Sequence, residues 1–297
     1  MKKKKRAKKN QWIFRGIFLL GLLILTYPII SDLYYRVDVK EEITDFDSQK
    51  DKLDQEEIDR RMGLAKAFND SLVNSITEDP YTKENHEKGR AEYARMLEIH
   101  EKIGHVEVPK IAQDLPIYAG TSEQILQKGV GHLEGTSLPI GGNSTHTVLT
   151  AHSGLPEKRL FTELSSLKLG DKFYIHNINE TLAYQVDQIK VIEPTNFDDL
   201  LVEPGHDYAT LLTCTPIMIN SHRLIVRGHR IPYVKAVDEE LMKDEKTNYL
   251  YRSLFFVALI LILILLIILI KQIRKNRKTE ARIKSLENKD QEASHES

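Results

Sequence analysis

An uninterrupted run of 18 uncharged residues, from Ser253 to Ile270, limits what this chain can fold into. A membrane-spanning helix needs about 17–25 predominantly apolar residues, whereas a helix in a soluble core usually keeps a polar face. This run is apolar all round and is followed directly by KQIRKNRK. Because basic residues beside a span favour the cytoplasmic side, the sequence predicts a transmembrane helix over 253–270 and a basic cytoplasmic tail over 271–297.

A second apolar segment lies near the N-terminus. Residues 1–11 carry the basic run MKKKKRAKK, and residues 12–31 hold no charge apart from Arg15, whose long side chain can reach the membrane interface. The pattern fits a cleaved signal peptide or a retained anchor, and the absence of a clear small-x-small cleavage site favours the anchor. Both termini would then be cytoplasmic, with residues 31–252 outside the cell membrane.

The charge distribution argues against nucleic acid as a partner. Residues 1–15 carry eight Lys or Arg, and residues 271–297 carry eight with five acidic residues. The middle of the chain therefore keeps 26 of the 42 basic and 38 of the 43 acidic residues. An acidic middle between basic ends is typical of a membrane-associated protein rather than a nucleic-acid-binding one.

Residues 32–102 are rich in charged residues and carry apolar residues at helical spacing. Met62, Ala65, Phe68 and Leu72 form one stripe, which predicts two or three helices packed against the following domain. Residues 40–55 also fit a charged, solvated linker. Pro80 interrupts the pattern, because proline lacks the backbone N–H and clashes with the preceding turn, so a loop is expected there.

From residue 103 the pattern changes to short strands between turn signals, which predicts a mainly β sandwich or barrel. Residues 237–252 are expected to form a polar linker back to the membrane. The expected strands are 105–111, 115–118, 145–151, 172–176, 183–191, 208–214 and 223–231.

The stretch 210–230, TLLTCTPIMINSHRLIVRGHR, reads as two strands joined by a turn, and it holds the only cysteine, Cys214. A lone cysteine cannot form an internal disulfide and usually behaves as a small buried hydrophobic residue. A cysteine nucleophile needs a nearby base or cation to lower the pKa of its thiol from about 8.5. Arg223 and Arg227 share a face of the second strand, but they lie about 13 Å apart, so only one can reach Cys214.

TLLTC followed by HRLIVRG resembles the signature of the sortases, the cysteine transpeptidases of Gram-positive bacteria. The spacing from Cys214 to Arg223 resembles the class C, pilus-building branch, and the resemblance extends over 129–156, GVGHLEGTSLPIGGNSTHTVLTAHSGLP. It implies a closed eight-stranded sortase barrel over 103–236, with N-terminal helices and a lid loop, flanked by two transmembrane helices.

The resemblance also implies the catalytic residues. Cys214 would attack a peptide carbonyl, His152 in VLTAHSG would act as acid and base, and Arg223 would bind the oxyanion or the substrate backbone. His132 and His146 lie nearby and are the alternative histidines. The substrates would be pilin or surface proteins bearing an LPxTG-like sorting signal, cut between Thr and Gly. A pilin lysine would then take the acyl group to give an isopeptide bond.

Asp79, Pro80 and Tyr81 resemble the lid motif of class C sortases, in which a loop lies across the active-site groove. By composition alone the same residues are a helix connection. The sequence has no clustered Cys and His and no paired carboxylates at metal-ligand spacing, so neither a metal nor a cofactor is expected.

Two other classes of function remain open on the sequence. One is a housekeeping sortase that attaches surface proteins to the cell wall, or a related cysteine peptidase. The other is a non-catalytic, membrane-tethered barrel in which Cys214 is merely packed. The second apolar segment and the loop at Asp79 favour the pilus-building branch over both.

Overall fold

The computed structural model describes residues 2–72 and 92–243, together with scattered helical positions between 254 and 274. The chain divides into two compact units at residue 242, and the first unit holds the β-domain. The named helices are α1 (Lys2–Lys50), α2 (Gln55–Ser71) and α3 (Glu123–Lys128), with short 3-10 turns η1 (Glu92–Leu97), η2 (Pro109–Ile111), η3 (Leu164–Ser166) and η4 (Asp198–Leu200). The strands are β1 (Lys102–Val108), β2 (Gln113–Ala119), β3 (Val130–His132), β4 (Thr145–Thr150), β5 (Lys172–His176), β6 (Thr181–Ile192), β7 (Asp207–Thr215) and β8 (His222–Ile231).

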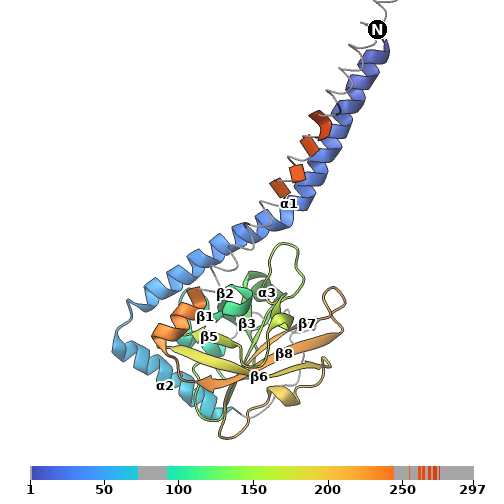
Figure 1. The fold of residues 1–297 in the computed structure, drawn as a ribbon. Coiled ribbons are helices and arrows are strands. Elements are labelled where there is room, and N and C mark those ends of the chain that lie inside the picture. The colour runs from blue at the N-terminus through green and yellow to red at the C-terminus, as the bar shows by residue number, and fades with distance from the viewer. Residues whose placement is uncertain are drawn as a thin grey trace, which may run out of the picture. The chain divides into compact units, whose positions relative to one another are not determined.

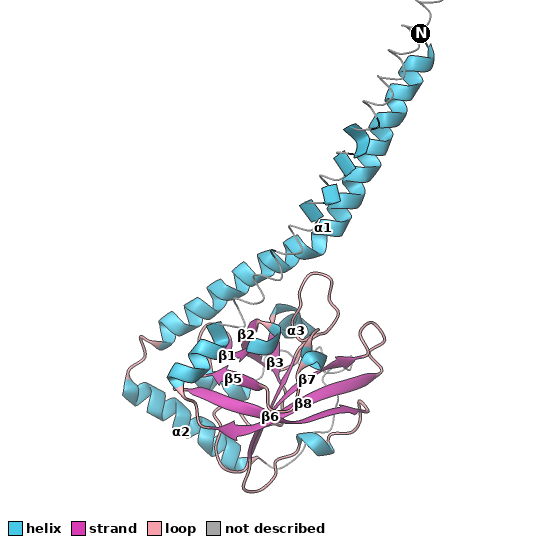
Figure 2. Ribbon diagram, in the orientation of Figure 1, coloured by secondary structure: helices cyan, strands magenta, loops and turns pink. Residues whose placement is uncertain are grey.

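The eight strands close into a barrel in the order β1-β2-β3-β4-β7-β8-β6-β5, with helices packed on its outside (Figures 1 and 2). The pairs β2–β3 and β4–β7 are parallel, and the other pairs are antiparallel. Closure pairs the strand edges within the domain, which resolves the choice between sandwich and barrel. The expected mainly β, eight-stranded barrel with N-terminal helices is confirmed.

The strand pattern of the sequence predicts seven of these eight strands but not β3. β3 has only three residues and is buried throughout, so it shows no polar and apolar alternation. The first expected strand, 105–111, also ends early at Val108, because Pro109 opens the turn η2. Both differences occur where an element is too short to leave a periodic signal.

Helix α1 packs along the barrel through its C-terminal half. Tyr35, Val39, Ile43 and Phe46 recur at helical spacing and are all buried, with Phe46 fully so. The alternative of a solvated linker over 40–55 is therefore wrong: the helix continues to Lys50, and a short turn leads into α2. Four apolar side chains on one face are enough to dock a helix that is otherwise charged.

Helix α2 begins at a capped N-terminus and ends against the barrel. The Asp54 carboxylate accepts the backbone N–H of Glu57 at 2.8 Å, which satisfies a donor that the first helical turn leaves unpaired. Ala65 of the predicted apolar stripe is fully buried. At the far end, the Asn69 side chain donates to the carbonyl of Leu138 at 3.2 Å and accepts its N–H at 2.8 Å.

The barrel extends further towards the C-terminus than the predicted boundary at 236. Residues 235–243 are helical, and Asp238 and Met242 are buried. The Asp238 carboxylate accepts the hydroxyl of Tyr174 at 2.9 Å and the ammonium of Lys172 at 2.8 Å. These contacts fix the start of the segment 237–252, which the sequence assigns to a linker, onto the barrel.

Among the residues that the structure describes, none of the helices is both long and apolar enough to cross a membrane. Most positions of the predicted span 253–270 fall outside the described part of the chain. The two transmembrane segments stay predictions. Residues 73–91 are likewise outside it, and they include the whole predicted lid, Asp79, Pro80 and Tyr81.

Candidate active site

Cys214 and Arg223 face each other across neighbouring strands. Cys214 of β7 is the register partner of Arg223 in the antiparallel strand β8. Opposed residues of an antiparallel pair point to the same face with their Cβ atoms about 4.5–5.5 Å apart. Both residues are 7% exposed. The guanidinium is held at the strand end, because its Nη1 donates to the carbonyls of Asn220 and His222, at 3.0 Å each.

His152 lies on a loop that is tied to the strand carrying Cys214. On one side of it, the N–H of Ala151 donates to the carbonyl of Leu212 at 3.2 Å, and the carbonyl of Ala151 accepts the hydroxyl of Thr213 at 2.7 Å. On the other side, the Ser153 hydroxyl donates to the carbonyl of Cys214 at 2.7 Å. His152 is thus held beside the end of β7. The structure brings the three residues predicted for catalysis to one end of the barrel.

The turn from β7 to β8 places an apolar rim next to this end of the barrel. Ile217, Met218 and Ile219 are all exposed, and Met218 is 83% exposed. The rim touches the histidine loop: a Cβ at Gly154, whose φ is +77°, would lie 2.6 Å from Cγ2 of Ile217. Glycine is needed there both for the left-handed backbone and for the close approach.

The two alternative histidines are structural. His132 is fully buried, and its Nε2 lies 2.8 Å from the carbonyl of Ser137. His146 has Nδ1 2.9 Å from the carbonyl of Leu201 and Nε2 2.8 Å from the hydroxyl of Thr210. Burial lowers the pKa of each imidazole to about 4, so both rings are neutral at pH 7 and are committed to bonds within the core.

Arg227 is held by other partners further along β8. It is the register partner of Thr210, four positions before Cys214 on β7. Its Nε donates to the carboxylate of Asp187 at 3.0 Å, and its guanidinium lies 4.1 Å from the ring centroid of Tyr208. This arginine therefore reinforces the barrel wall, which agrees with the expectation that only one of the two arginines reaches Cys214.

A residue that the sequence does not single out contacts the predicted catalytic histidine. Nε2 of His152 lies 3.3 Å from Oε1 of Glu123, the first residue of α3. The two residues are 29 positions apart, and Glu123 lies in the short polar segment TSEQ with no motif around it. Only the packing of α3 reveals the contact.

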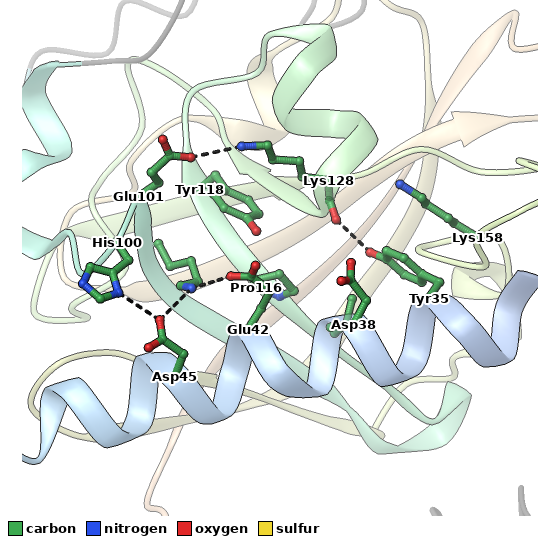
Figure 3. Close-up of a pocket in the computed structure, with 12 residues that line it drawn as sticks. Tyr35, Asp38, Glu42, Asp45, His100, Glu101, Pro116, Tyr118, Lys128 and Lys158 are labelled. Carbon is green, nitrogen blue, oxygen red and sulfur yellow. Dashed lines mark hydrogen bonds and ion pairs between the residues drawn. The ribbon is translucent and has the colours of Figure 1, made fainter.

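A separate cavity lies away from these residues, between α1 and the barrel (Figure 3). Its volume is about 560 Å³, and charged side chains and two tyrosines dominate its lining. Lys102 is buried in its wall and pairs with Glu42 at 2.5 Å and Asp45 at 3.2 Å. Cys214, His152 and Arg223 do not line it. Within the described residues no cluster of His, Cys, Asp or Glu is placed to hold a metal.

A cysteine with an arginine as its strand partner and a histidine on an adjoining loop, all at one end of a closed barrel, define a cysteine-dependent enzyme. Residues 106–231 match the family described as Sortase domain. Sortase C-1 of Streptococcus pneumoniae is 70% identical with a TM-score of 0.64, over 65% of this chain and 100% of that chain. A pilus-related sortase C of Group B Streptococcus is 70% identical with a TM-score of 0.62, over 64% and 97%.

A curated relative, Sortase A of Bacillus anthracis, is 27% identical over 132 residues, 44% of this chain. That match spans 61% of the relative's length, about three fifths of it. The chain belongs to the sortase family, and its likeness to the sortase C structures places it in the class C, pilus-related branch.

Proposed function

We propose that the chain is a cysteine transpeptidase that cleaves LPxTG-like sorting signals between Thr and Gly and joins pilin subunits through lysine isopeptide bonds. The observation that carries the proposal is the 70% identity to pilus-related sortase C over 97% of that structure. It favours the pilus-building role over a housekeeping sortase, and over a barrel in which the thiol is only packed.

In the first half-reaction, the thiolate of Cys214 attacks the Thr carbonyl carbon and forms a tetrahedral intermediate. Arg223 supports the negative oxygen, since the register pairing puts its guanidinium on the same face as the sulfur. When the tetrahedral intermediate collapses, the peptide bond between Thr and Gly breaks. His152 gives its proton to the departing amine, which leaves the acyl group on sulfur as a thioester.

In the second half-reaction, a pilin lysine amine attacks the thioester. His152 accepts the proton that the amine loses, and the sulfur leaves as the thiolate, so the enzyme returns to its starting state. The product is an amide between the Thr carboxyl group and the lysine. The exposed rim at Ile217, Met218 and Ile219 supports this use of the site, because an apolar surface beside the thiol suits the Leu-Pro part of a sorting signal.

We further propose that residues 12–31 and 253–270 anchor the enzyme in the cell membrane, with the barrel outside and both termini cytoplasmic. The basic runs on the terminal side of each apolar segment support this orientation. Protease added to intact protoplasts should digest residues 31–252 and spare tags on both ends. Digestion of a C-terminal tag from outside would contradict the orientation.

We also propose that Asp79, Pro80 and Tyr81 form a lid over Cys214, on the strength of their resemblance to the class C motif. An exposed ion pair from Asp79 contributes only about 0–1 kcal/mol, so closure need not be strongly favoured. Replacing Asp79 and Tyr81 together by alanine should speed the labelling of Cys214 by a small thiol reagent. Equal labelling rates would mean that the loop only connects helices.

Polymerisation of a pilin tests the proposed function as a whole. The full-length chain in detergent is incubated with a pilin that ends in an LPxTG-like signal, and polymers that resist boiling in SDS are counted on gels. The parent should produce a ladder, whereas Cys214→Ala should produce none while folding normally. A ladder from Cys214→Ala would overturn the proposed chemistry. Attachment to a cell-wall precursor instead of pilin lysine would indicate the housekeeping role.

A further inference from the structure

The short helix α3 carries a carboxylate to the imidazole of His152. We propose that Glu123 is a positioning residue that orients this imidazole and stabilises its protonated form. The proposal rests on the proposed transpeptidase function, because it assigns Glu123 a role in that reaction.

The contact engages one particular ring nitrogen. Oε1 of Glu123 lies 3.3 Å from Nε2 of His152, so a proton on Nε2 points to the carboxylate. A carboxylate that accepts this N–H fixes the tautomer and the orientation of the ring. The other ring nitrogen, Nδ1, is then the one that exchanges protons with the thiol and the substrate. The side chain of His152 is only 17% exposed, which limits competition from water.

Glu123 is itself held in place. The side-chain amide of Gln127, one turn later on α3, donates to the same Oε1 at 2.7 Å. Between them Leu126 is fully buried, which docks the helix on the barrel. The carboxylate is therefore aimed by its own helix, although Glu123 is about half exposed.

Two further contacts join α3 to the histidine loop and to α1. Lys158, six residues after His152, donates from its ammonium to the backbone carbonyl of Gln127 and lies 5.0 Å above the ring of Tyr35. The hydroxyl of Tyr35, from α1, donates to the backbone carbonyl of Lys128 at 2.9 Å (Figure 3). The helix that carries Glu123 and the loop that carries His152 are thus fastened to each other and to the long N-terminal helix.

The chemical consequence follows from the charge of Glu123. A thiolate is the nucleophile, and its proton must reside on the imidazole while the thiolate attacks. A carboxylate against Nε2 favours this thiolate and imidazolium pair over the neutral thiol and imidazole. Because a half-exposed ion pair is weak, we expect an effect of about two- to fivefold on the thiolate population rather than orders of magnitude.

The test compares Glu123→Gln with the parent in the full-length chain. Glutamine keeps the shape and one hydrogen-bond acceptor but lacks the charge, so a purely structural role would survive the change. The matched control is Glu163→Gln, since Glu163 is similarly exposed and its ion pair is with Arg159. Two rates are measured: alkylation of Cys214 by iodoacetamide at fixed pH, and thioester formation with an LPxTG-like peptide.

We expect Glu123→Gln to lower the alkylation rate and the kcat of acylation by about two- to fivefold, with KM unchanged and Glu163→Gln equal to the parent. Parent-like rates for Glu123→Gln, or a change in KM alone, would overturn the proposal. The two proposals fail separately. If the parent forms no thioester with any sorting peptide, the proposed function fails, whereas the alkylation rates still test Glu123.

Discussion

A buried histidine on β1 should make the stability of the barrel fall as the solution becomes alkaline. His105 lies between Asp114 of β2, whose Oδ1 is 2.7 Å from Nδ1, and Asp47 of α1, whose Oδ1 is 3.7 Å from Nε2. His176 of β5 stacks on it at 4.2 Å between ring centroids, and its own pKa is lowered by burial. Burial alone would lower the pKa of His105, but the two carboxylates raise it to about 9.

The magnitude follows from the difference between this pKa and the ordinary value of 6.5. Each unit of pKa difference is worth about 1.4 kcal/mol. The difference between the folded and unfolded pKa of His105 therefore corresponds to about 3 kcal/mol of folding free energy. The folded protein keeps a proton on His105 that the unfolded chain releases above pH 6.5. The stabilisation is therefore fully present below pH 6.5 and is lost as the pH rises through about 9.

Pulse proteolysis in urea measures this free energy on the full-length chain in detergent. From pH 6.5 to 9 the parent should lose about 3 kcal/mol of its free energy of unfolding. His105→Gln should remove most of this slope, because glutamine does not titrate. Asp114→Asn should reduce it, because the stronger of the two ion pairs is lost. A flat or rising profile in the parent, or an unchanged slope in His105→Gln, would refute the reasoning.

Two further predictions concern packing. Asn69→Ala should lower the free energy of unfolding by about 1–3 kcal/mol in urea titrations, because the buried N–H of Leu138 loses its partner and its carbonyl keeps only the N–H of Ile140; no change would mean that water replaces the amide. Arg227→Ala should lower the free energy of unfolding by about 1–2 kcal/mol, because the contacts with Asp187 and with the Tyr208 ring are lost. Acylation by a sorting peptide should stay close to that of the parent. Loss of acylation in a folded Arg227→Ala protein would contradict its assignment to the barrel wall.

The pairing of Cys214 with Arg223 could be predicted because the two residues flank a single turn. They lie nine positions apart, with a proline and polar residues between two strand-forming runs, so few hairpin registers are possible, and family likeness selects one of them. His152 could also be predicted, through its family likeness and its place just after the expected strand 145–151. Local sequence pattern can predict contacts of this kind, because a short connection between the two segments brings the residues together.

The contact between Glu123 and His152 could not be predicted in the same way. It depends on how a six-residue helix packs against a loop 29 positions away, and neither segment has a pattern that specifies its partner. The docking of α1 was left open between a packed helix and a solvated linker for a different reason: Val39, Ile43 and Phe46 stand among so many charges that the segment also resembles a linker. Burial of a few side chains, rather than average composition, decides where such a helix lies.

The central claim is that Cys214 carries the acyl group. Intact-mass measurement of the full-length chain, mixed with a panel of LPxTG-like peptides and quenched in acid, tests it most directly. We predict a mass increase equal to the peptide fragment ending at Thr, which maps to Cys214, is released by hydroxylamine and is absent from Cys214→Ala. An adduct of the same mass on Cys214→Ala, or a parent that stays unmodified by every peptide even after Asp79 and Tyr81 are replaced by alanine, would contradict the account.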